Sequence, residues 1–373
     1  MRIAIDAHAI GNRLTGNERY IANLAEQLLS ADRDNEYFLF FDREETSRRW
    51  TGRWSNVSTG VVSPSPWLRL GLDFPRQLRR LRADLFHYQY TGPLFRVCPE
   101  VATVHDVSFE RHPEFYGTAQ RLRLQLTVRR AARTARRIIT VSEFSKAEMV
   151  HYLGTPEEKV KVIYNGVGPE FRPRADAKEI RKHLEPYSVR RPYLLAVGNV
   201  SRRKNHGAAV RGFALWLSRR PQSEHRLVIA GNLQDAAPDV LGEAVRLGLP
   251  ADRLQVLGYV PESELPFLYA GADVLLNTSL YEGFGLPLAE AMGCGVPVIA
   301  GRASCFPEIA GGAARLVDTG DPEEMAQALE EVLENSGIRS EMIGRGLRRA
   351  AGFRWDVAAR ETLKVYDEAV QRP

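Results

Sequence analysis

The chain has 373 residues, of which 44% are apolar and 26% are charged, and its formal net charge is +5. This composition is ordinary for a globular protein, and the length predicts two domains. No run of about eighteen apolar residues is present and the first residues lead directly into a strand, which argues against a membrane-spanning helix and a signal peptide. Three cysteines without metal-like spacing indicate a reducing compartment, with no disulfide and no zinc site. We therefore expect a cytoplasmic protein.

The first half of the chain alternates short apolar strands with amphipathic helices, a pattern typical of α/β layers built on a parallel sheet. A helix is expected over residues 17–29, where apolar side chains recur at helical spacing. The carboxyl ends of parallel strands share one edge of the sheet, and ligands bind at that edge. We expect strands at residues 3–7, 37–41, 85–88, 101–104, 138–141 and 160–164.

Two loops at this edge carry candidate ligand-binding residues. The loop after the first strand contains Gly11 and Gly16 and indicates a flexible turn, but it is not a GxGxxG fingerprint, and plain loop glycines remain the alternative. A later loop places His105 and Asp106 just beyond a strand end. His105 can donate a hydrogen bond to a sugar hydroxyl or a leaving oxygen while Asp106 orients it, or it can be a satisfied structural group.

Seven arginines and no acidic residue lie between residues 121 and 137. At 100° per residue, Leu124, Val128, Ala131 and Ala135 form one apolar stripe. The simplest interpretation is a helix packed on the core with a solvated outer face. The alternative is peripheral contact with an anionic membrane or an acidic acceptor, whereas nucleic acid is not expected because no aromatic residues interleave with the arginines. The basic face consists of Arg129, Arg130, Arg133, Arg136 and Arg137.

The pattern of strands and helices breaks at residues 168–192, which contain four prolines near their two ends and a charged middle. This composition predicts a linker at 171–192 between an N-terminal domain at 1–170 and a C-terminal domain at 193–350. The last segment, 351–373, contains a predicted helix at 355–370 that packs back toward the first domain. In the second domain we expect strands at residues 193–197, 227–230, 255–257, 273–277 and 298–300.

The loop GNVSRRKNH, residues 198–206, follows the first strand of the second domain. Arg202, Arg203 and Lys204 at a strand end can neutralise a diphosphate, and in a group transfer they stabilise the charge that develops on the leaving group. Three consecutive basic residues are also common on solvated surfaces, but Gly198 and the strand-end position favour a site. Val260 follows another strand of this domain, where backbone groups can meet a nucleobase.

The sequence NTSLYEGFGLPLAEAMGCGVPVI, residues 277–299, holds two carboxylates around a glycine-rich turn. Glu282 lies before a helix that begins near Pro287, and Glu290 lies about one turn inside it. The two glycines leave backbone amides uncovered, so the turn and the helix start offer donors and a positive dipole end to an anion. An anion site with a carboxylate on either side suits a nucleotide sugar.

These motifs resemble the retaining GT-B glycosyltransferases of family 4, also called group 1. The run YEGFGLPLAEAMGCGVPV, whose two glutamates are separated by seven residues, looks like the paired-glutamate motif of that family. Further matches follow in order: DAHAIGNRLTGNERYIANL, TVHDVSF, VSEFSK, VIYNGV, VGNVSRRKNH and FRWDVAARETLKVY. The RRKN loop and TGNERY look closest to the mannosyltransferase branch that builds bacterial O-antigen chains. The resemblance covers nearly the whole chain and implies two Rossmann-like domains facing across an inter-domain cleft, the first for the acceptor and the second for the nucleotide sugar.

The resemblance implies a role for each matched residue. Glu290 would hold the ribose hydroxyls and Glu282 the hydroxyls of the donor sugar, while Arg203 and Lys204 would face the distal phosphate. His105 would hydrogen-bond the donor sugar near its reacting carbon. The run TGNERY and the dipeptide Ser-Arg before Arg203 depart from the usual family pattern, which puts the donor contacts of those two loops in doubt. The remaining donor-binding positions are Gly16, Asn17, Gly198, Val260, Phe284, Gly285 and Leu286.

The implied reaction transfers a hexose, mannose from GDP-mannose in first place, to a hydroxyl of a glycan or a lipid-linked saccharide in cell-surface polysaccharide synthesis. No carboxylate in the matched motifs is an evident covalent nucleophile, so front-face attack with retention is favoured. No metal and no other cofactor is expected, because the only Asp-x-Asp sequence, at residues 32–34, lies in a polar turn. The alternatives are a UDP-sugar-dependent transferase, a nucleotide-sugar epimerase and a non-catalytic nucleotide-sugar-binding subunit.

Overall fold

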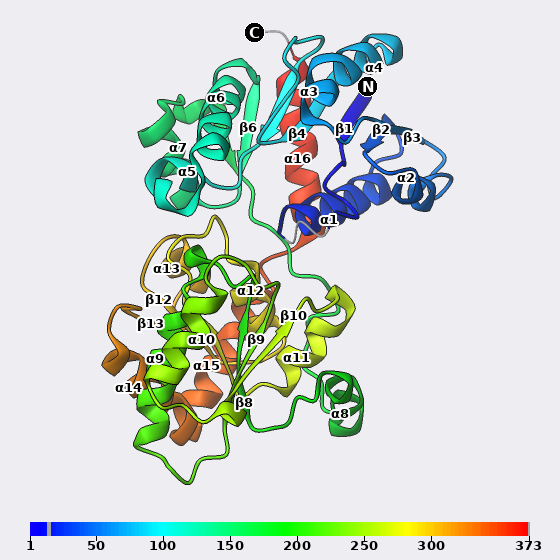
Figure 1. Cartoon of the computed structure of the whole chain (residues 1–373). Helices are drawn as coiled ribbons and strands as arrows, with labels where there is room; N and C mark the ends of the chain where they lie inside the picture. Colours follow the sequence, from blue (N-terminus) through cyan, green and yellow to red (C-terminus); the bar gives the residue numbers. More distant parts are fainter. Residues whose placement is uncertain (13–15, 372–373) are drawn as a thin grey trace. The chain divides into compact units, whose positions relative to one another are not determined.

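The computed structural model describes residues 1–12 and 16–371, and within them the chain forms two compact units (Figure 1). The first unit contains residues 1–166 together with the segment that begins at Arg354, and the second contains residues 167–353. Each unit has a parallel sheet of its own and helices packed around it. The α/β class predicted from the sequence is therefore confirmed.

A seven-stranded parallel sheet forms the centre of the first unit, in the order β3-β2-β1-β4-β5-β6-β7. Six strands lie within two residues of their predicted bounds. The seventh, β3, was not predicted, because its sequence VSTGV has no apolar run and, at the edge of the sheet, none of its residues is fully buried. The strands are β1 (Arg2–Asp6), β2 (Glu36–Phe41), β3 (Val57–Val61), β4 (Leu85–Gln89), β5 (Glu100–Thr103), β6 (Arg137–Thr140) and β7 (Val160–Val162).

Helices cover this sheet by burying side chains at helical spacing. Helix α1 buries Ile21, Leu24 and Leu28 on one face, as the apolar spacing of residues 17–29 predicts. The predicted C-terminal helix has the expected bounds and packs against α1 and the central strands of the first unit. The helices are α1 (Gly16–Ala31), α2 (Glu44–Trp50), α3 (Pro66–Leu68), α4 (Phe74–Leu81), α5 (Ser108–Arg111), α6 (Thr118–Thr134), α7 (Glu143–Leu153) and α16 (Trp355–Val370), with a π-helical turn at Arg69–Asp73 between α3 and α4.

The arginine-rich run is helical only as far as Thr134, where α6 ends. Its inner stripe is as predicted, since Val128, Ala131 and Ala135 are buried. The prediction that all five arginines share one basic helix face is wrong, however, because Arg136 lies beyond the helix and Arg137 is the first residue of strand β6. The chain must leave the helix there to enter the strand.

Three of the five arginines of the predicted basic face also have partners inside the protein. Arg129 pairs with Glu110 at 2.9 Å, Arg130 donates to the carbonyl of Leu94 at 2.6 Å, and Arg137 pairs with Glu368 at 3.1 Å. The other two, Arg133 and Arg136, are exposed and make no ion pair with the residues that the structure describes. These arginines therefore contribute to the packing of the unit more than to a continuous charged surface.

The second unit is built on a six-stranded parallel sheet in the order β10-β9-β8-β11-β12-β13. Its five predicted strands are present, and the short edge strand β13 was not predicted. The strands are β8 (Tyr193–Val197), β9 (Arg226–Ala230), β10 (Leu254–Gly258), β11 (Val274–Asn277), β12 (Val298–Gly301) and β13 (Arg315–Val317). The helices are α8 (Ala177–Leu184), α9 (His206–Ser218), α10 (Ala237–Arg246), α11 (Leu265–Gly271), α12 (Leu286–Gly293), α13 (Phe306–Ala310), α14 (Pro322–Glu334) and α15 (Ser336–Ala350).

Residues 171–192 are part of the second unit and are not a linker, which corrects the prediction from the sequence. Helix α8 lies in this segment and packs on α11, and it buries Ile180 and Leu184. A Cβ atom added to Gly271 of α11 would come within 3.0 Å of Leu184 Cδ1. These two apolar residues, one turn apart, pack the helix against α11. Because their sequence neighbours are mostly charged, they form no apolar stripe that predicts a packed helix. The chain passes between the units at residues 166–167 and again at 353–354.

The strand orders place the change of winding direction between β1 and β4 in the first sheet and between β8 and β11 in the second. In open parallel sheets, ligands bind outside the carboxyl ends of the strands at this point, because adjacent loops there turn to opposite faces and leave a crevice. The segments that directly follow these strands contain most of the predicted site residues; the exceptions are His105 after β5, Val260 after β10 and Glu290 inside α12. Within the described residues, no helix is long and apolar enough to cross a membrane. All three cysteines are free and buried.

We predict that Ile180→Ala loosens α8 from α11, because removing a buried aliphatic side chain leaves a cavity that costs about 2–5 kcal/mol. Limited digestion with proteinase K should then cut the segment at residues 171–192 at least about tenfold faster than in the wild type. Arg181→Ala, on the exposed side of the same helix, is the matched control and should leave the cleavage rate unchanged. Equal cleavage of wild type and Ile180→Ala would contradict the docking of α8.

Candidate functional site

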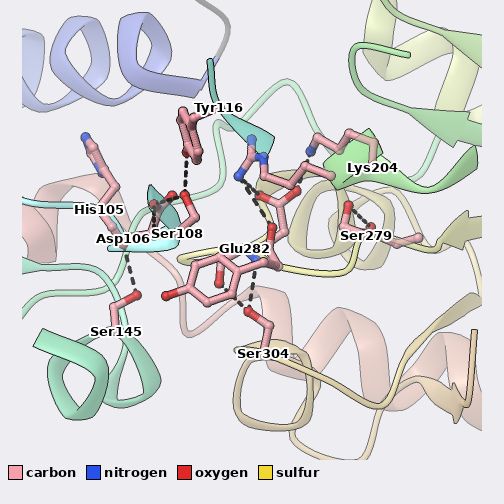
Figure 2. Close-up of polar contacts among 12 residues, drawn as sticks. His105, Asp106, Ser108, Tyr116, Ser145, Lys204, Ser279, Glu282 and Ser304 are labelled. Carbon is pink, nitrogen blue, oxygen red and sulfur yellow. Dashed lines mark hydrogen bonds and ion pairs between the residues drawn. The ribbon is translucent and has the colours of Figure 1, made fainter. Parts of the chain in front are cut away.

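The switch point of the second sheet holds a carboxylate between two cations. Lys204, in the loop after β8, contacts Glu282 Oε1 through its Nζ at 2.5 Å, and Arg203 Nη1 lies 3.5 Å from Glu282 Oε2. Figure 2 shows Lys204 and Glu282, whose contact joins the two loops. Glu282 and Lys204 are largely buried. The distances show that Arg203, Lys204 and Glu282, the three residues of this domain predicted as catalytic, lie together.

The two loops are joined by backbone as well as by charge. The N–H of Leu280 donates to the carbonyl of Arg203 at 2.8 Å, and Thr278 Oγ1 donates to the carbonyl of Lys204 at 3.1 Å. Ser304, beyond β12, accepts from the N–H of Glu282 and donates to its carbonyl. These contacts fix the cations and the carboxylate before any ligand arrives. Thr278 and Ser304 were not predicted, although each follows a strand next to the predicted loops.

Two glycines are required by the close approach of side chains at this site. Gly198 has φ of +138°, and a Cβ there would lie 2.9 Å from Lys204 Cε. Gly285 has φ of +82°, and a Cβ there would lie 2.8 Å from the ring of Phe306. Gly198 therefore gives room to the lysine, and Gly285 forms the turn before α12.

Glu282 is ionised in spite of its burial. Burial by itself raises the pKa of this carboxyl, but the charges of Arg203 and Lys204 outweigh that effect and bring the pKa to about 2. Because the folded pKa is below the usual value, the pair stabilises the fold at neutral pH, and this contribution is lost as the pH falls toward 2. A permanent carboxylate can accept hydrogen bonds from hydroxyl groups and cannot act as an acid at neutral pH.

Beside this pair, the start of α12 offers backbone donors. The N–H groups of Gly285 and Leu286 have no hydrogen-bond acceptor among residues 1–12 and 16–371. Pro287 occupies the first turn, where the missing N–H costs no helical bond. Together with Arg203 and Lys204, these donors are the candidate groups for the anion site that the sequence predicts.

Other predicted residues of this unit lie outside the cluster. Glu290 is buried in α12, where Tyr269 donates a hydrogen bond to its Oε2 at 3.0 Å. Val260 follows β10, and β9 and β8 separate that strand from β11. Arg202 Nε lies 3.7 Å from Asp235 Oδ2, and no contact between Arg202 and Glu282 is present among the described residues. Phe284 packs edge-on against Phe353.

In the first unit, His105 follows β5 and contacts Gln89 at the end of β4. His105 Nε2 lies 2.7 Å from Gln89 Oε1. An amide oxygen can only accept, so Nε2 carries the proton and donates to Gln89. Burial lowers the pKa of His105 to about 4, although Asp106 opposes the change. His105 is therefore neutral at neutral pH, and its Nδ1 is a hydrogen-bond acceptor, which corrects the expectation that this side chain donates to a ligand.

The position of His105 is fixed by its neighbours. Its backbone carbonyl accepts a hydrogen bond from Ser145 Oγ at 2.9 Å, and its ring lies edge-on to Tyr20 with centroids 4.6 Å apart. Asp106 does not contact the imidazole of His105; it accepts hydrogen bonds from the N–H and hydroxyl of Ser108, as Figure 2 shows. Asp106 thus orders the loop instead of orienting the ring.

The glycine-rich loop after β1 is described only in part, because residues 13–15 lie outside the described residues. Gly16 opens α1 and is exposed, with open space where a Cβ would lie, and Asn17 follows in the first turn. Glu18 Oε1 accepts a hydrogen bond from the N–H of Gly11 at 2.8 Å. Gly16 and Asn17 therefore lie at the switch point of the first sheet, at the carboxyl end of β1. Across the described residues, no group of three His, Cys, Asp or Glu side chains could hold a metal ion.

We predict that the imidazole ¹⁵N spectrum of His105 shows the Nε2-protonated tautomer at neutral pH and becomes doubly protonated near pH 4. Gln89→Glu places a carboxylate against Nε2 and should raise that midpoint by at least about one pH unit, whereas Gln89→Ala should give a mixture of tautomers. His151, on α7, is an internal reference whose imidazole ¹⁵N signals at neutral pH the substitutions should leave unchanged. A wild-type spectrum dominated by the Nδ1-protonated form would contradict the assignment.

Sequence models of two families match the chain, and each covers most of one unit. The family described as Glycosyltransferase Family 4 matches residues 14–171, and the family described as Glycosyl transferases group 1 matches residues 177–349. The chain is 28% identical to O-antigen chain mannosyltransferase B of Escherichia coli, over 98% of the chain and 99% of that protein. It is 32% identical to a D-inositol 3-phosphate glycosyltransferase of Kineococcus radiotolerans, over 64% of the chain and 58% of that protein.

The fold is also similar to solved structures. Sucrose-phosphate synthase from Thermosynechococcus elongatus superimposes with a TM-score of 0.78 at 19% identity, covering 99% of this chain and 98% of that one. This likeness supports the GT-B fold, in which two Rossmann-like sheets occur in one chain. The chain belongs to the group 1 glycosyl transferases of glycosyltransferase family 4.

Proposed function

We propose that the protein transfers a hexose, with retention, from a nucleotide-diphosphate sugar to a hydroxyl of a saccharide or lipid-linked saccharide acceptor in cell-surface polysaccharide synthesis. The observation that carries the proposal is the Glu282 carboxylate held between Lys204 and Arg203 at the switch point of the second sheet. Cations suit the diphosphate of such a donor, and an ionised carboxylate suits the hydroxyls of its sugar.

Binding of the donor would change the hydrogen-bond partners of Glu282, Lys204 and Arg203. The distal phosphate would take hydrogen bonds from Lys204 and Arg203 and from the N–H groups of Gly285 and Leu286. Glu282 would then lose part of its pairing and would accept hydrogen bonds from the sugar hydroxyls in return. Glu290 would hold the ribose by exchanging the hydroxyl of Tyr269 for those of the ribose.

The transfer step follows from these positions. The acceptor oxygen forms a bond to the anomeric carbon on the face from which the nucleotide diphosphate leaves, and a phosphate oxygen takes the acceptor proton. Lys204 and Arg203 stabilise the negative charge that develops on the leaving diphosphate. His105 accepts a hydrogen bond from a donor-sugar hydroxyl through Nδ1. No metal and no further cofactor has a part in this scheme.

Mannose, carried by GDP, is the donor sugar that we propose first. The similarity to O-antigen chain mannosyltransferase B supports it, since that match extends over nearly the full length of both chains. A UDP-linked sugar is the second choice. A nucleotide-sugar epimerase on the same fold would need no acceptor, so labelled GDP-mannose incubated without acceptor separates the two: clean epimerisation would rule out the transferase.

We predict that GDP raises the thermal unfolding midpoint of the protein more than UDP or ADP at equal concentration, because a ligand that binds only the folded chain stabilises it. Purified protein with GDP-mannose and a mannoside acceptor should then release GDP and form a product with retained anomeric configuration, which proton NMR can establish. A larger shift with UDP would replace GDP-mannose by a UDP-sugar as the donor.

We predict that Lys204→Ala lowers kcat/KM by about 10²–10³-fold, since it removes charge stabilisation of the leaving group. Glu282→Ala should lower it by a similar factor, because it removes a contact to the sugar. Arg202→Ala is the matched control, next in sequence but directed at Asp235, and it should retain wild-type turnover. Full activity in Lys204→Ala or Glu282→Ala would contradict the site assignment.

A further inference from the structure

An apolar surface lies over the helical run that connects β3 to β4 in the first unit. The run comprises α3, the π-helical turn and α4 and buries Leu70, Phe74 and Leu78 toward the core. Its outer side carries Trp67, which is 72% exposed, and Leu72, which is 57% exposed. Large apolar side chains with this much exposed surface contribute little to packing within the unit. Figure 1 shows α3 and α4 adjoining one another in this unit.

A second segment extends the same surface. The N–H of Leu94 donates to the carbonyl of Leu70 at 2.9 Å, so Leu94 lies against the helical run. Phe95 in this segment is 63% exposed. We call the combined surface the apolar platform, and it consists of Trp67, Leu68, Leu72, Leu94 and Phe95.

Unpaired positive charge borders the apolar platform. Asp73 is the one acidic residue between positions 66 and 82, and its carboxylate accepts a hydrogen bond from the N–H of Ser63. Residues 91–97 contain no acid. The arginines on the outer side of the run and its neighbouring segment are exposed and make no ion pair with any described residue: Arg76, Arg79, Arg80, Arg82 and Arg96.

We propose that the apolar platform and its arginines are the surface by which the protein lies on an anionic lipid membrane. Apolar side chains beside arginines on one helical face match a bilayer interface, where acyl chains lie beneath negative headgroups. A second copy of this chain is a poor partner, because its platform would bring a like-charged group of arginines into contact. The five arginines of the α6 region, three of which have internal partners, are not the main contact.

The position of the apolar platform relative to the first sheet fits the proposed transfer reaction. This step of the inference rests on that proposed function. The run begins shortly after β3 ends, and Arg69 of the run donates to the carbonyls of Ser63 and Pro64 in that connection. Its first residues therefore lie toward the carboxyl edge of the first sheet, where His105 also lies. A membrane-bound protein would thus present this edge near the surface from which a lipid-linked acceptor projects.

The test is flotation of the full chain with phosphatidylcholine vesicles that contain or lack phosphatidylglycerol. We expect the wild type to float only with the anionic vesicles. We expect at least about twentyfold weaker binding from the Arg76→Glu/Arg80→Glu pair, since every basic residue near such a surface contributes about fivefold. We expect a loss of similar size from the Trp67→Ser/Leu72→Ser pair, because it removes apolar area that would be buried in the membrane interface. The matched control is Leu241→Ser/Val245→Ser, two exposed apolar residues of α10 in the second unit, which should float like the wild type.

Unchanged flotation of both platform variants, or no flotation of the wild type, would overturn the proposal. So would concentration-dependent dimers of the wild type, seen by sedimentation equilibrium, that the Trp67→Ser/Leu72→Ser pair abolishes. Turnover with a water-soluble acceptor should be equal in wild type and variants, and equal turnover also shows that the variants are folded. A wild type without turnover would contradict the proposed transfer but leave the flotation result standing, so the two failures are distinguishable.

Discussion

The burial of Glu282 carries a desolvation cost that Arg203 and Lys204, together with a hydrogen bond from Ser279, offset. In a largely water-free position, a carboxylate whose partner is removed loses several kcal/mol of stabilisation. A phosphate that draws Lys204 away therefore leaves Glu282 short of partners, and sugar hydroxyls can supply the missing hydrogen bonds. In the function that we propose, this exchange would make the binding of the phosphate and of the sugar interdependent: a free diphosphate would satisfy the cations but not the carboxylate, whereas the whole donor would satisfy both.

Sheet topology makes that arrangement possible. The strand order places β8 beside β11, so the loop with Lys204 and the loop with Glu282 are neighbours although 78 positions separate the two residues. Backbone hydrogen bonds from Leu280 and Thr278 hold the loops together, so the charges do not have to do so alone. The same logic places Gln89 next to His105 in the first sheet, since β4 and β5 are adjacent strands. The candidate site residues Glu282, Lys204 and His105 all come from loops that parallel strands position.

The sequence predicted what depends on local pattern and missed what depends on distant partners. Helix α16 has its predicted bounds, because Trp355, Ala359 and Tyr366 recur at helical spacing. Glu282 and Lys204 were identified because a glycine-rich turn and a strand end surround them. Gln89 was not, since nothing in its own neighbourhood distinguishes it, and it matters only through the tautomer that it imposes on His105, in the loop after β5. Helix α8 was taken for a linker because two buried side chains among many charged ones give a weak pattern.

Arginine count and arginine availability are different quantities, and the first unit shows why. The run at residues 121–137 has more arginines, yet Glu110, the Leu94 carbonyl and Glu368 engage three of them. The arginines at positions 76–82 are fewer, but they make no ion pair with any residue that the structure describes, and the same helical run carries exposed tryptophan and leucine side chains. An anionic surface gains most from charges that the protein has not already neutralised. The surface that binds a membrane is therefore better identified from unpaired cations next to exposed apolar residues than from the longest basic stretch of sequence.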